Sequence, residues 1–535
     1  MAEFVRARGA ILVDSPHIAK WQRRALEGAL DVLDIQAVIV CENSRNNKNV
    51  FKNFLYYILN LFSIRNSETV AVPWRDLVKH DCEVVTFSCT EIDGWQVIGT
   101  SVSPAVKALG LDVIVRLGMN LIRDPESLPA RHGVLSFHHG DPRAFRGRPA
   151  GFYEILNHAD SIGSIVQQLS TKLDSGTVRA FGQYRLTKHS YRRTLEYVYS
   201  QSASLLRLAV LNCLEGTTVD MDARGKVFRL PTNTVVLRFL TIILWRKLRR
   251  LVFGLFFTRS WEISWSNTTD IAGDHQLVEL STRDRVAKPA GVSFIADPFI
   301  LRDGVIICEA MPRHGTQGKL MIHDGQTWSE LDTTFLDDTR HLSFPFVLNH
   351  EEKTYVLPEM AQYGQQELWE IGEALRVTDV HHLRGLEDQR LIDPVLFRSD
   401  DQWWLFAGVS GSEADHLYLW SCHSLEGVFV PHRKNPVVIN PASARNAGGL
   451  ITLNGQLLRL GQNNCDEYGD GITVHRVLEL SHESYREKTI QTIKAMGSRG
   501  PHTLSTNGHL SIIDHYSITF DPLSWYARAK GVLGK

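Results

Sequence analysis

The chain has 535 residues, of which 43% are hydrophobic and 22% charged, and its formal net charge at pH 7 is −1. This balance excludes a strongly basic nucleic-acid-binding protein and an acidic disordered one. The length exceeds what one hydrophobic core usually holds, so we expect two or three domains. The seven cysteines are scattered without a Cys-x-x-Cys pair, which argues against a disulfide framework and favours a cytoplasmic location. The apolar run near the start is short and indicates a buried strand, not a signal peptide.

Residues 9–120 alternate between short apolar runs and helix-length stretches. The runs are GAILVD, QAVIVC, EVVTF and LDVIV, each four to six residues long. Apolar runs of this length between helices are typical of a parallel sheet that is covered on both faces. The pattern therefore predicts a Rossmann-like α/β domain over 1–230. No Gly-x-Gly-x-x-Gly follows the first run, so we expect no dinucleotide site.

The second half contains an internal repeat. Five related strand openings recur: FIADPFIL, LSFPFVL, LIDPVLF, RNAGGLI and GPHTLS. We align them on Asp297, Pro345, Asp393, Ala447 and His502. The spacings between these residues are 48, 48, 54 and 55. A period near 50 residues with short strands is the signature of propeller blades. The sequence predicts an all-β, five-bladed propeller over 285–535, joined to the first domain by a linker at 231–284.

The predicted linker contains a basic apolar helix over 235–257. It carries five lysines and arginines and no acidic residue, which makes spanning a bilayer costly. This composition is typical of a helix that lies in a membrane interface. A second apolar stretch, 51–65, has the same character. Both segments could instead pack internally as a brace between domains, and the sequence leaves the two interpretations open. Membrane contact would make the protein peripheral on the inner membrane face.

Residues 133–176 contain a candidate catalytic pair. The strand VLSF delivers His138 to its carboxyl end, where open α/β sheets place their sites, and Asp174 follows in Leu-Asp-Ser-Gly. A histidine beside a carboxylate can act as a general acid and base. From the residues alone, a structural role for both remains open.

This stretch resembles the formyltransferase family, with His138, Phe145-Arg146-Gly147 and Asp174 in the family order, and the resemblance covers about 8–230. It implies transfer of a formyl group from N10-formyltetrahydrofolate to an amine. Ser136 stands where the family has an asparagine, so its hydroxyl would hydrogen-bond the formyl oxygen. The run LDVIVRLGMNLI resembles the segment that cradles the folate donor, which implies donor binding by Arg116, Leu117, Gly118 and Met119.

The propeller half resembles the N-terminal domain of plant glucosamine inositolphosphorylceramide transferases over about 290–485, on motifs such as HLSFPFVL, YVLPEM and ARNAGGLI. The Asp-Pro openings are also similar to those of five-bladed glycosidases. Strands that open propeller blades line the central channel, so a carboxylate cluster is expected there from Asp297, Glu309, Glu359 and Asp393. The residues expected to bind sugar hydroxyls beside it are His341, His432, Arg445, Arg459 and Gln462. Asp-Pro pairs that merely end strands are the alternative.

The leading functional hypothesis is an N-formyltransferase acting on an amino sugar, nucleotide- or lipid-linked, with the propeller binding the acceptor. A second hypothesis places glycosidase or glycosyltransferase-like chemistry in the propeller, with a vestigial α/β domain. A third is a non-catalytic folate- or glycan-binding scaffold. No metal is expected, because the paired histidines at 138–139 and 381–382 lack partners at ligand spacing. No nucleic-acid partner is expected either.

Overall fold

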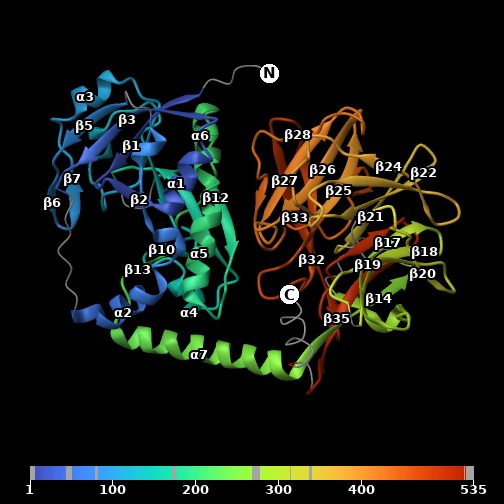
Figure 1. The fold of residues 1–535 in the computed structure, drawn as a ribbon. Coiled ribbons are helices and arrows are strands. Elements are labelled where there is room, and N and C mark those ends of the chain that lie inside the picture. The colour runs from blue at the N-terminus through green and yellow to red at the C-terminus, as the bar shows by residue number, and fades with distance from the viewer. Residues whose placement is uncertain are drawn as a thin grey trace. The chain divides into compact units, whose positions relative to one another are not determined.

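A computed structural model describes residues 6–43, 51–78, 82–171, 176–267, 277–313, 315–336, 340–522 and 525. The chain divides into two compact units, Met1–Leu248 and Arg249–Lys535 (Figure 1). The division falls inside helix α7 (Asn233–Phe256), within the stretch that the sequence assigned to a linker.

The first unit is built on a seven-stranded sheet in the order β12-β11-β9-β8-β1-β3-β5. Its strands are β1 (Ala7–Val13), β3 (Leu33–Cys41), β5 (Glu83–Phe87), β8 (Val113–Arg116), β9 (Val134–His138), β11 (Ser161–Gln168) and β12 (Thr177–Arg185). The strands β5, β3, β1, β8 and β9 are parallel, as the apolar runs predicted. The strands β11 and β12 add an antiparallel edge, so the predicted Rossmann-like sheet is corrected to a mixed one.

This unit also contains α-helices, the last of which continues into the second unit. They are α1 (Lys20–Glu27), α2 (Phe54–Ser63), α3 (Ser103–Ala108), α4 (Phe152–Leu156), α5 (Tyr191–Ser202), α6 (Leu205–Leu214) and α7. Val106 of α3 shares a core with Ala10 and Leu12 of β1. Helix α6 contacts β11, β12 and α1. Short strands pair around the sheet: β2 (His17–Ala19) with β4 (Ala71–Pro73), β6 (Thr90–Ile92) with β7 (Trp95–Val97), and β10 (Phe145–Gly147) with β13 (Lys226–Phe228).

The second unit is a five-bladed propeller, as predicted. Blade A contains β17 (Val292–Arg302), β18 (Val305–Pro312), β19 (Lys319–His323) and β20 (Trp328–Glu330). Blade B contains β21 (Ser343–His350), β22 (Lys353–Glu359), β23 (Glu367–Ile371) and β24 (Val377–His382). Blade C contains β25 (Leu391–Ser399), β26 (Gln402–Val409), β27 (His416–Cys422) and β28 (Val430–Pro431), and β29 (Val438–Ile439) also pairs with β27.

The last two blades draw on strands from before the first repeat. Blade D contains β30 (Ile451–Leu453), β31 (Gln456–Gln462), β32 (Ile472–Leu480), β33 (Tyr485–Met496) and β15 (Leu277–Glu279). Blade E contains β34 (Leu504–Thr506), β35 (Ser511–Phe520), β14 (Phe257–Ser266) and β16 (Asp284–Val286).

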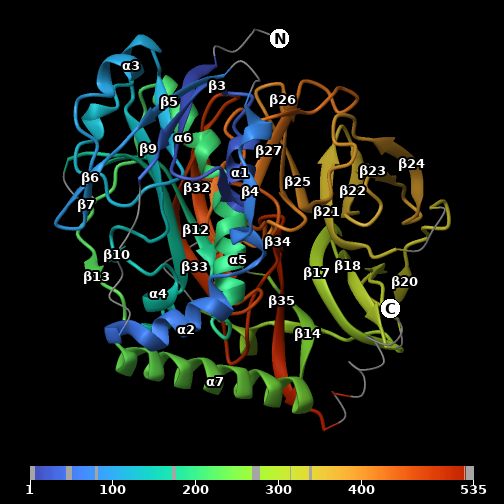
Figure 2. The ribbon, with the colours of Figure 1, turned by 60° about the vertical axis from the view of Figure 1, so that its left-hand side comes forward.

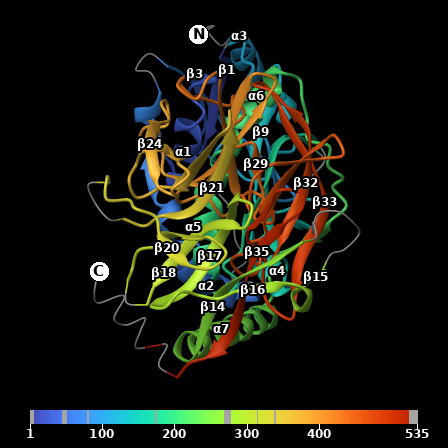
Figure 3. The ribbon, with the colours of Figure 1, turned by 90° about the vertical axis from the view of Figure 1, so that its right-hand side faces the viewer.

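The propeller closes through β14, which pairs with β35 along its whole length (Figure 3). Two strands from each end of this unit therefore share blade E, an arrangement that joins the first and last blades into a closed ring. This corrects the sequence-based boundary, because β14 and β15 lie in the predicted linker at 231–284 and β16 begins at its last residue. The propeller begins at β14, directly after α7.

The first strand of blades A, B and C carries a bulge at an X-Pro step. The register shifts at Asp297-Pro298, at Phe344-Pro345 and at Asp393-Pro394. The residue before each proline has positive φ, at 51° for Asp297, 41° for Phe344 and 47° for Asp393. Aspartate tolerates this conformation better than most residues, and a bulge redirects a side chain out of the strand's alternation. The repeat detected in the sequence thus marks the bulges that orient the two aspartates.

The closure predicts a large stability difference between two isoleucines of blade E. Ile263 of β14 is fully buried in a core with Ile512, whereas Ile518 on β35 is 44% exposed. We expect Ile263→Ala to lower the free energy of unfolding by about 2–5 kcal/mol and Ile518→Ala by less than about 0.5 kcal/mol. Urea denaturation of the full chain measures both. Equal effects would contradict the assignment of β14 to the propeller core.

Candidate active site

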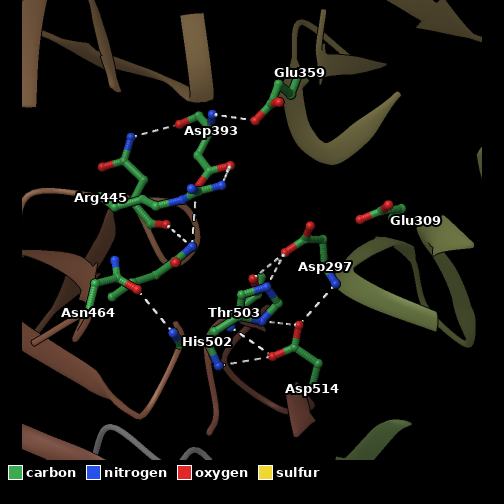
Figure 4. A network of polar contacts seen from close by, with 12 residues as sticks. Asp297, Glu309, Glu359, Asp393, Arg445, Asn464, His502, Thr503 and Asp514 are labelled. Atoms are coloured by element: carbon green, nitrogen blue, oxygen red, sulfur yellow. Dashed lines mark hydrogen bonds and ion pairs between the residues drawn. The ribbon is translucent and has the colours of Figure 1, made fainter. Parts of the chain in front are cut away.

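Acidic side chains from three blades converge near the propeller axis (Figure 4). Asp297 and Asp393 come from the bulges of blades A and C, and Glu309 and Glu359 from the second strands of blades A and B. All four are at most 8% exposed. The two glutamates occupy equivalent positions, because Glu309 pairs with the residue before Asp297 and Glu359 with the residue before Phe344. The structure therefore brings together the four carboxylates that the sequence predicted.

Asp393 is held by partners from blade D. Arg445 donates from Nε to Oδ2 at 2.6 Å and from Nη2 to Oδ1 at 3.2 Å, and Gln462 Nε2 donates to Oδ2 at 3.1 Å. Asn446 Nδ2 donates to the Asp393 carbonyl at 2.8 Å, and the Asp393 backbone N–H donates to Glu359 Oε2 at 3.2 Å. A two-point pair with a guanidinium stabilises the ionised carboxylate and fixes its plane. Arg445 and Gln462 thus lie where the sequence placed them.

Asp297 is held by blade E. Thr503 Oγ1 donates to Asp297 Oδ1 at 2.7 Å, and His502 Nε2 lies 3.2 Å from the same oxygen. The other ring nitrogen of His502 lies 2.5 Å from Asp514 Oδ2, which also accepts the Asp297 backbone N–H at 3.0 Å. Burial lowers the pKa of His502, but Asp514 and Asp297 outweigh it and raise the pKa above its ordinary value. The raised pKa favours a proton on this imidazole, which lies between two carboxylates.

Three of the four acids have a raised pKa. Burial raises the pKa of Asp297 to about 6, with His502 opposing the rise. Burial, assisted by the charge of Asp297, raises the pKa of Glu309 well above its ordinary value. Burial and the neighbouring Asp393 do the same for Glu359. Carboxyl groups of unequal acidity in one site are what general acid–base chemistry requires.

Glu309 depends on close packing with His341. His341 Nε2 lies 3.7 Å from Glu309 Oε1, and its Nδ1 accepts the Gly318 N–H at 2.8 Å. A Cβ on Gly318 would lie 2.5 Å from Glu309 Oε1 and 2.8 Å from the His341 ring. Only glycine leaves room for this approach. His341 therefore lies at the edge of the carboxylate cluster, as predicted.

Two predicted sugar-binding residues lie elsewhere, which corrects the sequence interpretation. Arg459 of β31 binds Glu487 of β33 at 2.7 Å through both Nε and Nη2 and is fully buried there. His432 follows the outer strand β28, and its ring Nδ1 accepts the Lys434 N–H. Both residues stabilise blade packing away from the carboxylates.

The sequence interpretation missed His502, Thr503 and Asp514 as site residues. His502 belongs to the fifth strand opening, and Asp514 follows it by 12 residues, the same distance that separates Asp297 from Glu309. Extending the repeat alignment to second strands would have found Asp514. Asp297, His502 and Asp514 also offer three ligand atoms within 4.8 Å of one another, a donor set that could hold a cation.

The first unit has a separate pocket at the carboxyl ends of β8 and β9, lined in part by Arg116, Ser136 and His138. Arg116 Nε donates to Ser136 Oγ at 3.0 Å, and burial lowers the pKa of Arg116 to about 10. Asp174, the predicted partner of His138, lies outside the described residues.

The segment predicted to cradle a donor lies beside this pocket, against the end of β1. Leu117 and Gly118 donate backbone N–H groups to the Leu12 carbonyl, at 2.9 and 3.1 Å. Met119 donates its N–H to Asp14 Oδ2 at 2.8 Å. Leu117, Gly118 and Met119 do not line the pocket; Arg116 does. Folate binding by this segment stays a prediction.

Comparisons with known proteins connect the propeller half to one family. Residues 279–512 match the family model described as glucosamine inositolphosphorylceramide transferase 1, N-terminal. The glucosamine inositolphosphorylceramide transferase 1 of Arabidopsis thaliana is 32% identical over 212 residues, covering 36% of this chain. The chain matches only 27% of the length of that relative. The resemblance inferred from the propeller motifs is therefore confirmed for this half.

Two solved structures illustrate the structural comparison. An α-L-arabinanase of Cellvibrio cellulosa, in complex with arabinohexaose, is 12% identical with a TM-score of 0.30 and covers 40% of this chain and 85% of its own. A glycinamide ribonucleotide transformylase 1 from Symbiobacterium toebii is 14% identical with a TM-score of 0.29 and covers 42% of this chain and 95% of its own. Likenesses at this level carry no argument about function.

These matches correct the leading functional hypothesis. The family model and the Arabidopsis relative name a glucosamine inositolphosphorylceramide transferase, a different enzyme class from the predicted formyltransferase. The assignment of the first unit as a formyltransferase domain is not supported. The predicted donor, N10-formyltetrahydrofolate, followed from that assignment, and none of these matches tests it. The second hypothesis, glycan chemistry in the propeller, agrees better with the matches.

The raised pKa of Glu309 predicts a pH-dependent stability difference. A glutamate whose folded pKa exceeds its unfolded pKa stabilises the fold fully at low pH, and this stabilisation is lost as the pH rises through the folded pKa. Glu309→Gln removes the titration. We expect the free energy of unfolding of the variant, relative to wild type, to increase as the pH rises from 4 to neutral and above.

Chemical denaturation across this pH range measures the difference. Glu426→Gln, at an exposed position in blade C, is the matched control and should show no such trend. A flat difference for Glu309→Gln would contradict the raised pKa.

Proposed function

We propose that the propeller is a glycan-processing unit that breaks or transfers a glycosidic bond at the axial carboxylates. The observation that carries the proposal is the convergence of Asp297, Glu309, Glu359 and Asp393, which differ in their surroundings. Glycoside chemistry requires one protonated carboxyl group, which donates a proton to the leaving oxygen, and one carboxylate, which acts as base or nucleophile. The cluster contains both kinds of group.

The surroundings of each residue support an assignment of roles. Burial beside Asp297 raises the pKa of Glu309 well above its ordinary value, so Glu309 is the candidate general acid. Asp297, with a pKa of about 6, ionises at neutral pH and is the candidate base or nucleophile. Asp393 is fixed by Arg445 and Gln462, so it is suited to accept hydrogen bonds from sugar hydroxyls. Glu359 supports the backbone of Asp393.

The matched family supports a substrate class. Its printed name combines glucosamine with an inositol phosphate carried on ceramide. We propose a glycolipid of this class, with a sugar on an inositol phosphate headgroup, as the substrate. Because the match covers a quarter of the relative, whether the reaction is hydrolysis or transfer is decided by the products of the assay below.

The proposal predicts separate roles for the two units in turnover. With a short-chain glucosaminyl inositolphosphorylceramide as substrate, Asp297→Asn and Glu309→Gln should each lower kcat by about 10²–10⁴-fold. His138→Ala, in the pocket of the first unit, should leave kcat unchanged. Mass spectrometry of released glucosamine, or of glucosamine transferred to added inositol phosphate, measures turnover and distinguishes the two reactions.

Two results would overturn the proposal. Loss of turnover in His138→Ala with retention in Asp297→Asn would place the chemistry in the first unit. Binding of the glycolipid by wild type without turnover would reduce the propeller to a binding module, the scaffold hypothesis.

A further inference from the structure

Helix α7 exposes apolar residues on a face next to the one it buries. Val236, Phe239 and Ile243 are its buried side chains. The exposed stripe recurs at intervals of three, four, four and three residues and consists of Leu237, Leu240, Leu244, Leu248 and Leu251. Trp245 lies next to it and is 66% exposed. At about 100° per residue, the stripe is centred about 110° around the helix axis from the buried residues, so it lies on an adjacent face. A surface helix of a soluble domain normally presents polar residues there.

The buried face of α7 is firmly packed, so the exposed stripe is not a consequence of a loose helix. The Phe239 ring stacks on the Phe152 ring of α4, with the ring centroids 4.1 Å apart, and the Tyr191 ring packs edge-on against Phe239. Arg246 Nη1 donates to the Lys188 carbonyl at 2.9 Å and Nη2 lies 2.8 Å from His158 Nδ1. The orientation of the stripe is therefore fixed by the packing of the neighbouring face of α7.

The neighbouring helix α2 repeats the pattern. Figures 1 and 2 show α2 beside α7. Tyr56 of α2 is buried against Phe152, the residue that also holds α7, and the Leu55 N–H donates to Asn233 Oδ1 at 3.0 Å. The exposed residues of α2 are Phe54, Ile58, Leu61 and Phe62, and Phe62 is 71% exposed. The sequence of α2 contains no charged residue. Two adjacent helices thus present large apolar side chains to solvent.

Charge distinguishes among the surfaces that could cover these helices. Helix α7 contains Arg238, Arg246, Lys247, Arg249 and Arg250 and no acidic residue. By helical position, Arg238 and Arg249 flank the stripe on one side and Lys247 flanks it on the other. An apolar stripe bordered by cations on both sides complements a lipid surface, in which acyl chains lie beneath anionic headgroups.

These two helices are not suited to cross a bilayer. Among the helices in the described part of the chain, none is long and apolar enough to span a membrane. Helix α7 has too many cations distributed along its length, and α2 is only 10 residues long.

We infer that α2 and α7 bind the surface of an anionic lipid bilayer, lying in its interface, with Leu244, Trp245 and Phe62 inserted among the acyl chains. The inference stands on these two helices and does not depend on the chemistry of the propeller.

Vesicle flotation with the full chain tests it. We expect wild type to float with vesicles of phosphatidylcholine containing 30% phosphatidylglycerol and to bind pure phosphatidylcholine vesicles at least about tenfold more weakly. The double variant Leu244→Ser/Trp245→Ser should lose at least about tenfold in binding to the anionic vesicles. Lys247→Gln/Arg249→Gln should lose the preference for anionic vesicles. Both pairs are exposed, so the substitutions leave the core intact.

The matched control is Val428→Ser/Val430→Ser, which removes two apolar residues of blade C that are 56% and 57% exposed. It should bind vesicles like wild type, and so should Asp297→Asn, which separates this inference from the proposed function. Absence of flotation by wild type, or unchanged flotation by Leu244→Ser/Trp245→Ser, would overturn the inference. So would sedimentation of wild type as a dimer that Leu244→Ser/Trp245→Ser dissociates, because the stripe would then be an interface between copies.

Discussion

The propeller depends on balancing negative charge at its axis. Four carboxylates in a buried region repel one another and lose hydration, and both effects oppose folding unless protons or cations compensate. Arg445 compensates Asp393, and His502 compensates Asp297 and Asp514. Glu309 lies 3.7 Å from His341, whose pKa is lowered by burial, and burial raises the pKa of Glu309 well above its ordinary value. This division between acids paired with a cation and an acid with a raised pKa is also what makes the cluster chemically useful.

This balance of charge at the axis requires a closed propeller. The acids come mainly from blades A, B and C, whereas the compensating Arg445 and His502 come from the last part of the chain. Asp514 lies on β35, which is held along its length by β14 from the start of the unit. The site is therefore complete only when strands about 250 residues apart in the chain have paired. Stability of the closing blade and protonation of the site are coupled for this reason.

The sequence predicted the repeat because the bulged X-Pro openings recur in recognisable form. It could not reveal β14 as a propeller strand, because β14 directly follows the apolar helix α7 and precedes the first repeat. It placed Arg445 and Gln462 correctly but misplaced Arg459. On one strand, Arg459 and Gln462 are three positions apart, so their side chains point to opposite faces. The two residues can be distinguished only when it is known which face of β31 points toward the propeller axis.

The error in the predicted function has a different origin. The motif around His138 is local and lies at the carboxyl end of a parallel strand, a position where many unrelated α/β proteins place polar residues. Such a motif indicates a position in the fold more reliably than it indicates which reaction the protein catalyses. The propeller motifs extend over about 200 residues in a fixed order, and for that reason their resemblance was the one confirmed by comparison.

A crystal structure of the full chain soaked with glucosaminyl inositol phosphate tests the central claim most directly. We expect sugar density in contact with Asp297 and Asp393, with Glu309 within hydrogen-bonding distance of the glycosidic oxygen. Sugar density confined to the pocket beside His138, with the propeller axis unchanged, would contradict it.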